Sequence, residues 1–74
     1  MENKQNITVE VGDDKVAIVR FNRVKKMNAI SFEMFGEIQS VLEGLFAHNA
    51  KEVRAIVLTH NGPHFTAGLD LVSA

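Results

Sequence analysis

Two short apolar stretches near the start of the chain predict a β-hairpin. In residues 7–11 (ITVEV), apolar and polar residues alternate with the period of two of a half-buried strand. Residues 16–21 (VAIVRF) are β-branched and mostly apolar, so we expect a strand that is buried on both faces. Between them, residues 12–15 (GDDK) favour a tight turn. Residues 22–28 follow neither period and are expected to form a loop.

The next segment carries apolar residues at helical spacing. The stripe consists of Met34, Phe35, Ile38, Val41, Leu42, Leu45 and Phe46. Ser31 is a suitable N-cap and Glu33 suits the first turn, and the helix should end near residues 48–49. We expect the aromatic residues of this segment, Phe32 included, to lie in the core with Met34.

A further strand and a loop complete the pattern. Residues 53–59 (VRAIVLT) have an apolar centre that predicts a short buried strand. Residues 60–64 (HNGPH) are dense in turn-forming residues and should be a loop, which leads into residues 65–74. The order strand, strand, helix, strand predicts an α/β unit whose sheet continues beyond this chain. We expect residues 1–74 to be a single partial domain.

The composition limits what this unit can bury. The chain has 74 residues and no cysteine, so it can hold one small domain without disulfides or thiolate metal sites. Hydrophobic residues make up 46% of it, which argues against disorder, but a chain this short has only a small core. We therefore expect marginal stability unless a partner, or the rest of a longer chain, covers apolar surface.

The charge pattern argues against several classes of partner. A formal net charge of −1 gives no basic excess for nucleic acid or an anionic membrane. No apolar run approaches the roughly 20 residues of a membrane helix. We expect a cytoplasmic protein, or one of an organellar matrix if the source is eukaryotic. His60 and His64 have a spacing that metal ligands can have, but no third ligand is evident, so we expect no metal site.

Residues 66–70 (TAGLD) are the strongest candidates for chemistry. The small residues around Gly68 let a ligand approach the backbone closely. If a helix begins near Asp70, the amides of residues 68–71 point outward unpaired, and such amides can stabilise a developing oxyanion. The alternative is a strand-to-helix turn in which the glycine only permits a bend and Asp70 only caps the helix.

Two longer blocks carry a family resemblance. Residues 16–31 contain VAIVRFNR and, four residues later, NAIS, and residues 53–71 are VRAIVLTHNGPHFTAGLDL. In order and spacing these blocks resemble the first part of the crotonase (enoyl-CoA hydratase/isomerase) family, over most of the chain. Residues 65–71 (FTAGLDL) are especially similar to dienoyl-CoA isomerase members. The resemblance implies an incomplete crotonase-type ββα spiral, made of a hairpin, a helix, a strand and an oxyanion loop.

The resemblance also implies a substrate and a site. Members of the family bind acyl-CoA thioesters and polarise the thioester carbonyl with two backbone amides, without a metal or redox cofactor. The first amide belongs to the residue after the Ala-Gly pair, here Leu69, and residues 67–71 would line the thioester pocket. The implied substrate-binding residues are Lys25, Lys26, Ala29, Ala67, Gly68, Leu69, Asp70 and Leu71.

The basic loop has its own expected role. Residues 23–29 would lie along the CoA nucleotide, with Lys25 and Lys26 meeting its phosphates as point charges. A solvated basic loop is the alternative for these two lysines. Val24 stands where the family commonly has proline, so this loop has one restraint fewer on its conformation.

The family's remaining catalytic groups come later than Ala74. They are the second oxyanion amide and the catalytic carboxylates, so we expect weak CoA binding without turnover. The parent reaction would be hydration or double-bond isomerisation of an enoyl-CoA. A rival hypothesis is a non-catalytic remnant or oligomerising module that associates through its sheet edge and apolar helix stripe, and a third is an unstable fragment. A homo-oligomer or the rest of a longer chain is the expected protein partner.

Overall fold

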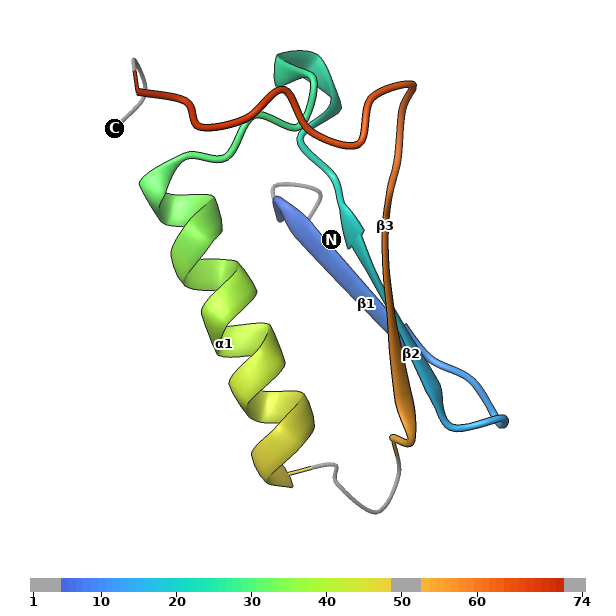
Figure 1. Cartoon of the computed structure of the whole chain (residues 1–74). Coiled ribbons are helices and arrows are strands. Elements are labelled where there is room, and N and C mark those ends of the chain that lie inside the picture. The colour runs from blue at the N-terminus through green and yellow to red at the C-terminus, as the bar shows by residue number, and fades with distance from the viewer. Residues whose placement is uncertain (1–4, 49–52, 72–74) are drawn as a thin grey trace.

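The computed structural model describes residues 5–48 and 53–71, and it shows a three-stranded sheet with one long helix (Figure 1). The strands, in sheet order, are β1 (Ile7–Val11), β2 (Val16–Phe21) and β3 (Ala55–His60). The helix, α1 (Phe32–His48), lies between the second and third strands in the sequence. The predicted hairpin, helix and further strand are therefore confirmed, and the fold is mixed α/β.

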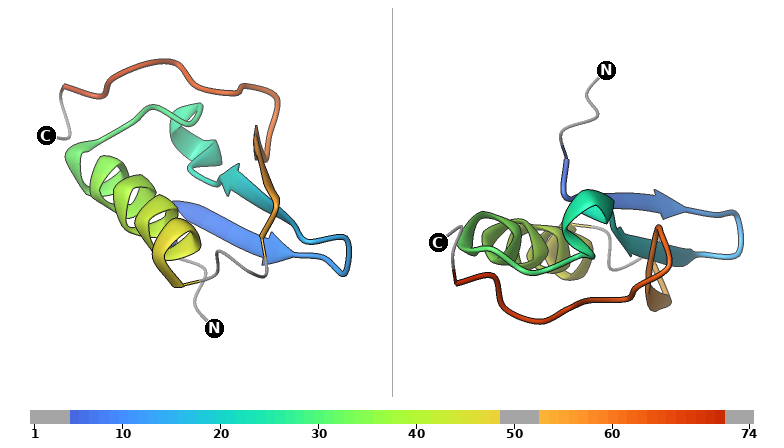
Figure 2. Two further views of the ribbon diagram at one scale, coloured as in Figure 1. Left: turned by 60° about the horizontal axis from the view of Figure 1, so that its bottom comes forward. Right: turned by 90° about the horizontal axis from the view of Figure 1, so that it is seen from above.

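The central strand pairs differently on its two sides. β1 runs antiparallel to β2, with Ile7 opposite Phe21. β3 runs parallel to β2, with Val16 opposite Ala55. A parallel pair requires a crossover connection, and α1 supplies it. Figure 2 shows that the segment after β3 runs back to the start of α1, so loops that follow two parallel strands meet at one end of the molecule.

The core lies between one face of the sheet and one side of the helix. Its buried residues are Ile7, Ala17, Val19, Phe21, Met34 and Leu45. Ala17, Val19 and Met34 have no exposed surface. The alternate residues of β2 point to the other face and are only half-buried. β2 is therefore fully buried on one face and not on both, because α1 packs against one side of the sheet.

The helix begins as predicted. The Met34 N–H donates to the Ser31 hydroxyl at 3.2 Å, which is an N-cap contact, and Glu33 lies in the first turn. One turn later, the Glu37 carboxylate accepts hydrogen bonds from the Asn6 N–H at 3.2 Å and the Asn6 side-chain amide at 2.7 Å. These contacts hold the start of α1 beside the entry to β1.

The aromatic residues of α1 do not lie in the core. Phe32, Phe35 and Phe46 are 72%, 62% and 69% exposed, so the core prediction was right for Met34 and wrong for these three. At 3.6 residues per turn, they lie about 100–160° around the helix from Met34, on a side that a sheet of three strands does not cover. We call these three residues the phenylalanine flank.

No helix in the described part of the chain is long and apolar enough to span a membrane.

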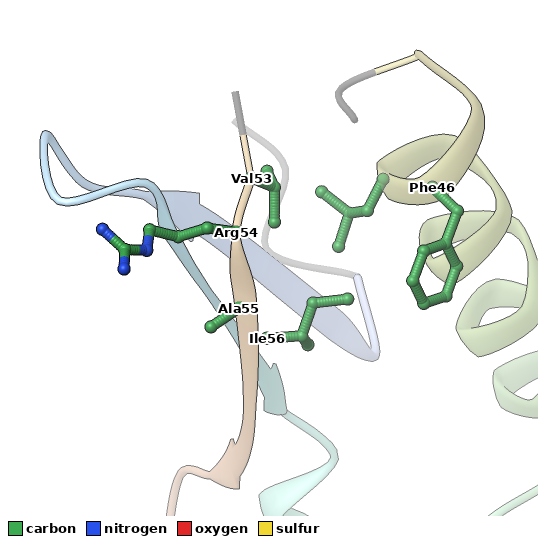
Figure 3. Close-up of a pocket in the computed structure, with 6 residues that line it drawn as sticks. Phe46, Val53, Arg54, Ala55 and Ile56 are labelled. Atoms are coloured by element: carbon green, nitrogen blue, oxygen red, sulfur yellow. The ribbon is translucent and has the colours of Figure 1, made fainter. Parts of the chain in front are cut away.

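One end of the phenylalanine flank borders a hollow between α1 and β3 (Figure 3). The residues that line it are Leu45, Phe46, Val53, Arg54, Ala55 and Ile56. Phe46 on the helix faces Ile56 on the strand, while Arg54 points away from the helix. The apolar side of the helix therefore continues into an apolar surface of the strand.

β3 is more exposed than its sequence predicts. Val57 and Leu58 are 46% and 48% exposed, although we expected a buried strand. β3 pairs with β2 on one edge only, and its other edge has no strand partner among residues 5–48 and 53–71. The strand also begins two residues later than expected and includes His60.

Candidate functional site

Two loops that are far apart in the sequence run side by side at the end of the sheet. Residues 22–31 follow β2 and residues 61–70 follow β3, and we call the pair the loop crossing. The first loop was expected to lack regular structure but contains a short 3-10 turn, η1 (Val24–Lys26). The Ala67 N–H donates to the Met27 carbonyl at 3.0 Å and joins the two loops.

A parallel backbone bridge fixes the direction of the Leu69 amide. The Ile30 N–H donates to the Gly68 carbonyl and the Asp70 N–H donates to the Ile30 carbonyl, both at 2.8 Å. Leu69 is the bridge partner of Ile30 and lies between these two bonds. Because successive backbone groups of an extended chain point to opposite sides, the Leu69 N–H points away from Ile30. It donates no hydrogen bond to any residue in the described ranges.

Gly68 supplies the backbone conformation that this arrangement needs. Its φ is +102°, a region that residues with a side chain rarely adopt, whereas a Cβ there would meet no atom within 4 Å. The Gly68 N–H donates to the Thr66 hydroxyl at 3.0 Å. The amides of Gly68 and Asp70 are therefore paired, so the prediction of free amides across residues 68–71 was wrong for these two, whereas the Leu69 and Leu71 amides have no acceptor among the described residues.

Asp70 pairs with an arginine and does not cap a helix within the described residues. One Arg23 guanidinium nitrogen donates to the Asp70 carboxylate at 2.8 Å and to the Ala29 carbonyl at 2.7 Å. The two charged side chains are 16% and 12% exposed. The chain is not helical as far as Leu71, and residues 72–74 lie outside the described residues. The helix that Asp70 was expected to cap thus falls outside the described residues, and within them Asp70 forms an ion pair that ties the two loops.

Sequence reasoning placed Arg23 only in the loop of residues 23–29 that was expected to lie along the CoA nucleotide. Two N–H groups of one guanidinium nitrogen reach a carboxylate and a carbonyl together. An arginine directly after a buried strand was the available signal. It was not sufficient, because the partner Asp70 is 47 residues away and only the parallel pairing brings the two together.

The structure gathers the predicted substrate-binding residues around one open hollow, which we call the basic hollow. It is lined by Lys25, Lys26, Met27, Ala29, Ala67, Leu69, Asp70 and Leu71. These are all of the predicted residues except Gly68, with Met27 as an addition that the sequence did not single out. Lys25 and Lys26 are exposed at its wall. Met27 has a left-handed φ of +53° and is 52% exposed, so it shapes the wall.

A second hollow lies on the other side of the same segment, and we call it the apolar hollow. It is lined by Ile30, Ser31, Phe32, Phe35, Leu69, Asp70 and Leu71. Residues 69–71 belong to both hollows and form the wall between them. Leu69 and Leu71 are 72% and 75% exposed. A ligand at this wall would meet charge on one side and the phenylalanine flank on the other.

His60 at the end of β3 and His64 in the second loop have no metal-binding arrangement among the described residues. The His60 Nδ1 lies 3.0 Å from the Gly62 carbonyl, and its ring packs edge-on against Phe65 at 5.7 Å between centroids. Phe65 also stacks on Phe21 at 5.0 Å. In the described part of the chain, no three His, Cys, Asp or Glu residues are grouped as metal ligands. His60 therefore takes part in packing the turn.

Comparisons with known proteins identify the family of this chain. The family model described as enoyl-CoA hydratase/isomerase matches residues 12–74. Human enoyl-CoA delta isomerase 2 is 37% identical over 65 residues, which are 88% of this chain and 16% of that protein. The chain therefore spans only about a sixth of this relative.

Solved structures give the same result for the fold. A probable enoyl-CoA hydratase from Mycobacterium thermoresistibile superposes with a TM-score of 0.84 at 32% identity, over 96% of this chain and 29% of that one. A putative enoyl-CoA hydratase/isomerase (crotonase) from Legionella pneumophila gives 0.82 at 34% identity, over 95% of this chain and 26% of that one. This chain belongs to the enoyl-CoA hydratase/isomerase family and has the fold of its amino-terminal portion.

Proposed function

We propose that this chain carries one half of an acyl-CoA thioester site in a protein of fatty-acid or related acyl-CoA metabolism. The Leu69 N–H would donate to the thioester carbonyl, and Lys25 and Lys26 would meet the CoA phosphates. The observation that carries the proposal is the Leu69 amide, which has no partner among the described residues and borders the basic hollow. Family membership supports the choice of ligand.

The proposed chemistry follows from where charge develops. When a proton leaves the carbon next to a thioester carbonyl, negative charge moves onto the carbonyl oxygen. A backbone amide that is already oriented stabilises that charge without reorganisation, and one such donor is typically worth about 2.7–4 kcal/mol in the transition state. Ala67, Gly68, Asp70 and Leu71 would form the wall that holds the thioester against this amide.

Proton transfer needs a further group. The carboxylate at the wall of the basic hollow, Asp70, is engaged by Arg23, so it is poorly suited to act as a base. We therefore propose binding without turnover for this chain. Hydration or double-bond isomerisation of an enoyl-CoA is the proposal for the whole protein, with coenzyme A thioester as substrate and no other cofactor.

The test is calorimetric titration of the chain with acetyl-CoA. A chain of 74 residues is accessible to chemical synthesis, so the Leu69 amide can be replaced by an ester, which removes the N–H and changes little else. Loss of one hydrogen bond should weaken binding roughly three- to tenfold. An ester at residue 65, outside both hollows, is the matched control. Equal affinity of the two esters, or no binding by the folded parent chain, would reject the proposal.

The lysines have a separate signature. The double variant Lys25→Gln, Lys26→Gln should weaken binding of acetyl-CoA and reduce the dependence of its affinity on salt, since exposed charges act on phosphates through screened electrostatics. Lys15→Gln, in the distant β1–β2 turn, is the control. If the variants share the parent's salt dependence, the lysines belong to a solvated loop.

A second candidate function is self-association without catalysis. The observation that favours it is the phenylalanine flank, which leaves large apolar side chains exposed along one side of α1. A homo-oligomer, or further chain of the same protein, would cover this surface.

Two expectations from the sequence remain predictions. The cytoplasm or an organellar matrix is the predicted compartment. Residues 65–71 are predicted to resemble the corresponding segment of dienoyl-CoA isomerases.

A further inference from the structure

Asn28 is a buried polar residue of the loop crossing, and both polar atoms of its side chain are hydrogen-bonded. It is 1% exposed. Its side-chain oxygen accepts from the Arg23 N–H at 2.6 Å. Its side-chain nitrogen donates to the carbonyls of Asn61 at 2.9 Å and His64 at 2.7 Å. Asn28 therefore joins the start of the first loop to two points of the second.

The backbone of Asn28 extends this network toward the proposed site. The Thr66 hydroxyl donates to the Asn28 carbonyl at 2.7 Å and accepts from the Gly68 N–H at 3.0 Å. A continuous chain of hydrogen bonds thus runs from Asn28 through Thr66 to Gly68. Gly68 precedes Leu69, and its carbonyl is one of the two backbone groups that fix the Ile30 bridge.

Two independent requirements select asparagine at this position. The φ of Asn28 is +56°, a left-handed conformation that asparagine and glycine tolerate better than other residues. The side chain must also accept one N–H and donate to two carbonyls, which only a primary amide can do here. Glycine tolerates the left-handed conformation but has no side chain to bond. Aspartate can accept the N–H but cannot donate to the two carbonyls when it is ionised. Substitution by each residue therefore tests the backbone requirement and the hydrogen-bonding requirement separately.

We propose that Asn28 is a positioning residue, which holds the Leu69 amide in the direction needed for the thioester carbonyl. The proposal rests on the proposed function of that amide. Asn28 lines neither the basic hollow nor the apolar hollow, so it acts through Thr66, Gly68 and the loop that carries them. It is not itself a contact of the ligand.

The test compares local with global opening by amide hydrogen exchange. In Asn28→Gly, the Ile30 and Asp70 amides, which flank Leu69 in the bridge, should lose about tenfold or more of their protection, because the side-chain bonds between the loops are gone. The Val19 amide of the central strand should lose much less. The control Glu37→Ala breaks the Asn6 contacts at another place and should not open the bridge selectively.

Asn28→Asp adds a readout that depends on pH. Its carboxylate would face two carbonyl oxygens near neutral pH and open the bridge, whereas the protonated acid can donate one hydrogen bond. Protection of Ile30 and Asp70, corrected for intrinsic exchange, should therefore recover as pH falls in this variant and not in Asn28→Gly. If Asn28→Asp is poorly folded at neutral pH, the exchange protection of Ile30 and Asp70 in Asn28→Gly still decides the test.

Acetyl-CoA binding separates this inference from the proposed function. If the parent chain binds, Asn28→Gly should weaken binding about tenfold and Glu37→Ala should not. If the parent chain does not bind, the proposed function fails, while selective loss of bridge protection still shows that Asn28 sets the local geometry. Equal loss of protection at Val19, Ile30 and Asp70 would overturn the inference, since Asn28 would then stabilise only the fold as a whole.

Discussion

The loop crossing and the phenylalanine flank are neighbours built on opposite principles. In the crossing, the buried polar side chains of the described residues all have hydrogen-bond partners within this chain. On the flank, three large aromatic side chains are mostly exposed. A buried polar group needs a hydrogen-bond partner at bonding distance, and the two loops of the crossing supply such partners to each other. An apolar side chain needs only to be covered by other apolar groups, and the three strands do not cover this side of α1. The polar groups of the crossing are thus satisfied among the described residues, whereas the flank leaves apolar surface exposed.

The largest expected effect comes from breaking the ion pair of the crossing. Arg23→Met removes the donor to both Asp70 and Ala29, and should lower the free energy of unfolding by about 1.5–3 kcal/mol, the range for hydrogen bonds to charged groups. Urea unfolding followed by circular dichroism measures the loss.

A double-mutant cycle shows whether the loss belongs to the pair. Asp70→Asn should be less costly in the Arg23→Met background than in the parent chain, because its principal described partner is already gone. Additive losses from the two substitutions would contradict a coupled pair. The crossing would then be held mainly by its backbone bridge and by Asn28.

Thr66 should have the next largest effect. Thr66→Val keeps the shape of the side chain but removes the hydroxyl between the Asn28 carbonyl and the Gly68 N–H, and should cost about 1–3 kcal/mol. Thr66→Ser keeps the hydroxyl and is the matched control. Unfolding curves that agree for the valine and serine variants would show that the hydroxyl adds nothing to the crossing.

Substitution of the phenylalanine flank should have the smallest effect on the fold and a clear effect on association. The triple variant Phe32→Gln, Phe35→Gln, Phe46→Gln should change the free energy of unfolding of the monomer by less than about 0.5 kcal/mol, since exposed positions contribute little. In sedimentation equilibrium, the parent chain should associate with rising concentration and the variant should not. A monomeric parent chain would argue against the self-association hypothesis.

Local patterns predicted the elements of this fold well. The alternation in residues 7–11 and the apolar run of residues 16–21 correspond to β1 and β2 as observed. Ser31 caps α1, which ends within a residue of the prediction. These features depend on a few neighbouring residues, so a single sequence contains the information for them.

Burial was predicted less well, because it depends on what surrounds each element. The helical stripe of α1 is wide enough for two contact surfaces, and spacing alone could not divide Met34 from Phe35. The apolar centre of β3 has the composition of a strand covered on both sides, yet Val57 and Leu58 are exposed. An apolar pattern shows that a surface favours burial, and it does not show which part of the protein buries it.

The candidate site divides in the same way. The sequence by itself determined that residues 66–70 permit close backbone approach, and its family blocks singled out Leu69 and the two lysines. Only the tertiary structure decided that the Leu69 amide is left unpaired while the Asp70 amide is bonded, because that depends on the Ile30 bridge between loops that follow two parallel strands.

The partners of Asn28 and Arg23 were equally out of reach of the sequence. Each binds residues more than 30 positions away. The residue type determines which hydrogen bonds a side chain can make, and a left-handed backbone conformation favours asparagine. The pairing of β2 with β3 determines which residues lie close enough to accept or donate those bonds. Sequence thus determined the local conformations and chemical capacities of this protein, and tertiary structure determined which of those capacities are satisfied and which remain available to a ligand.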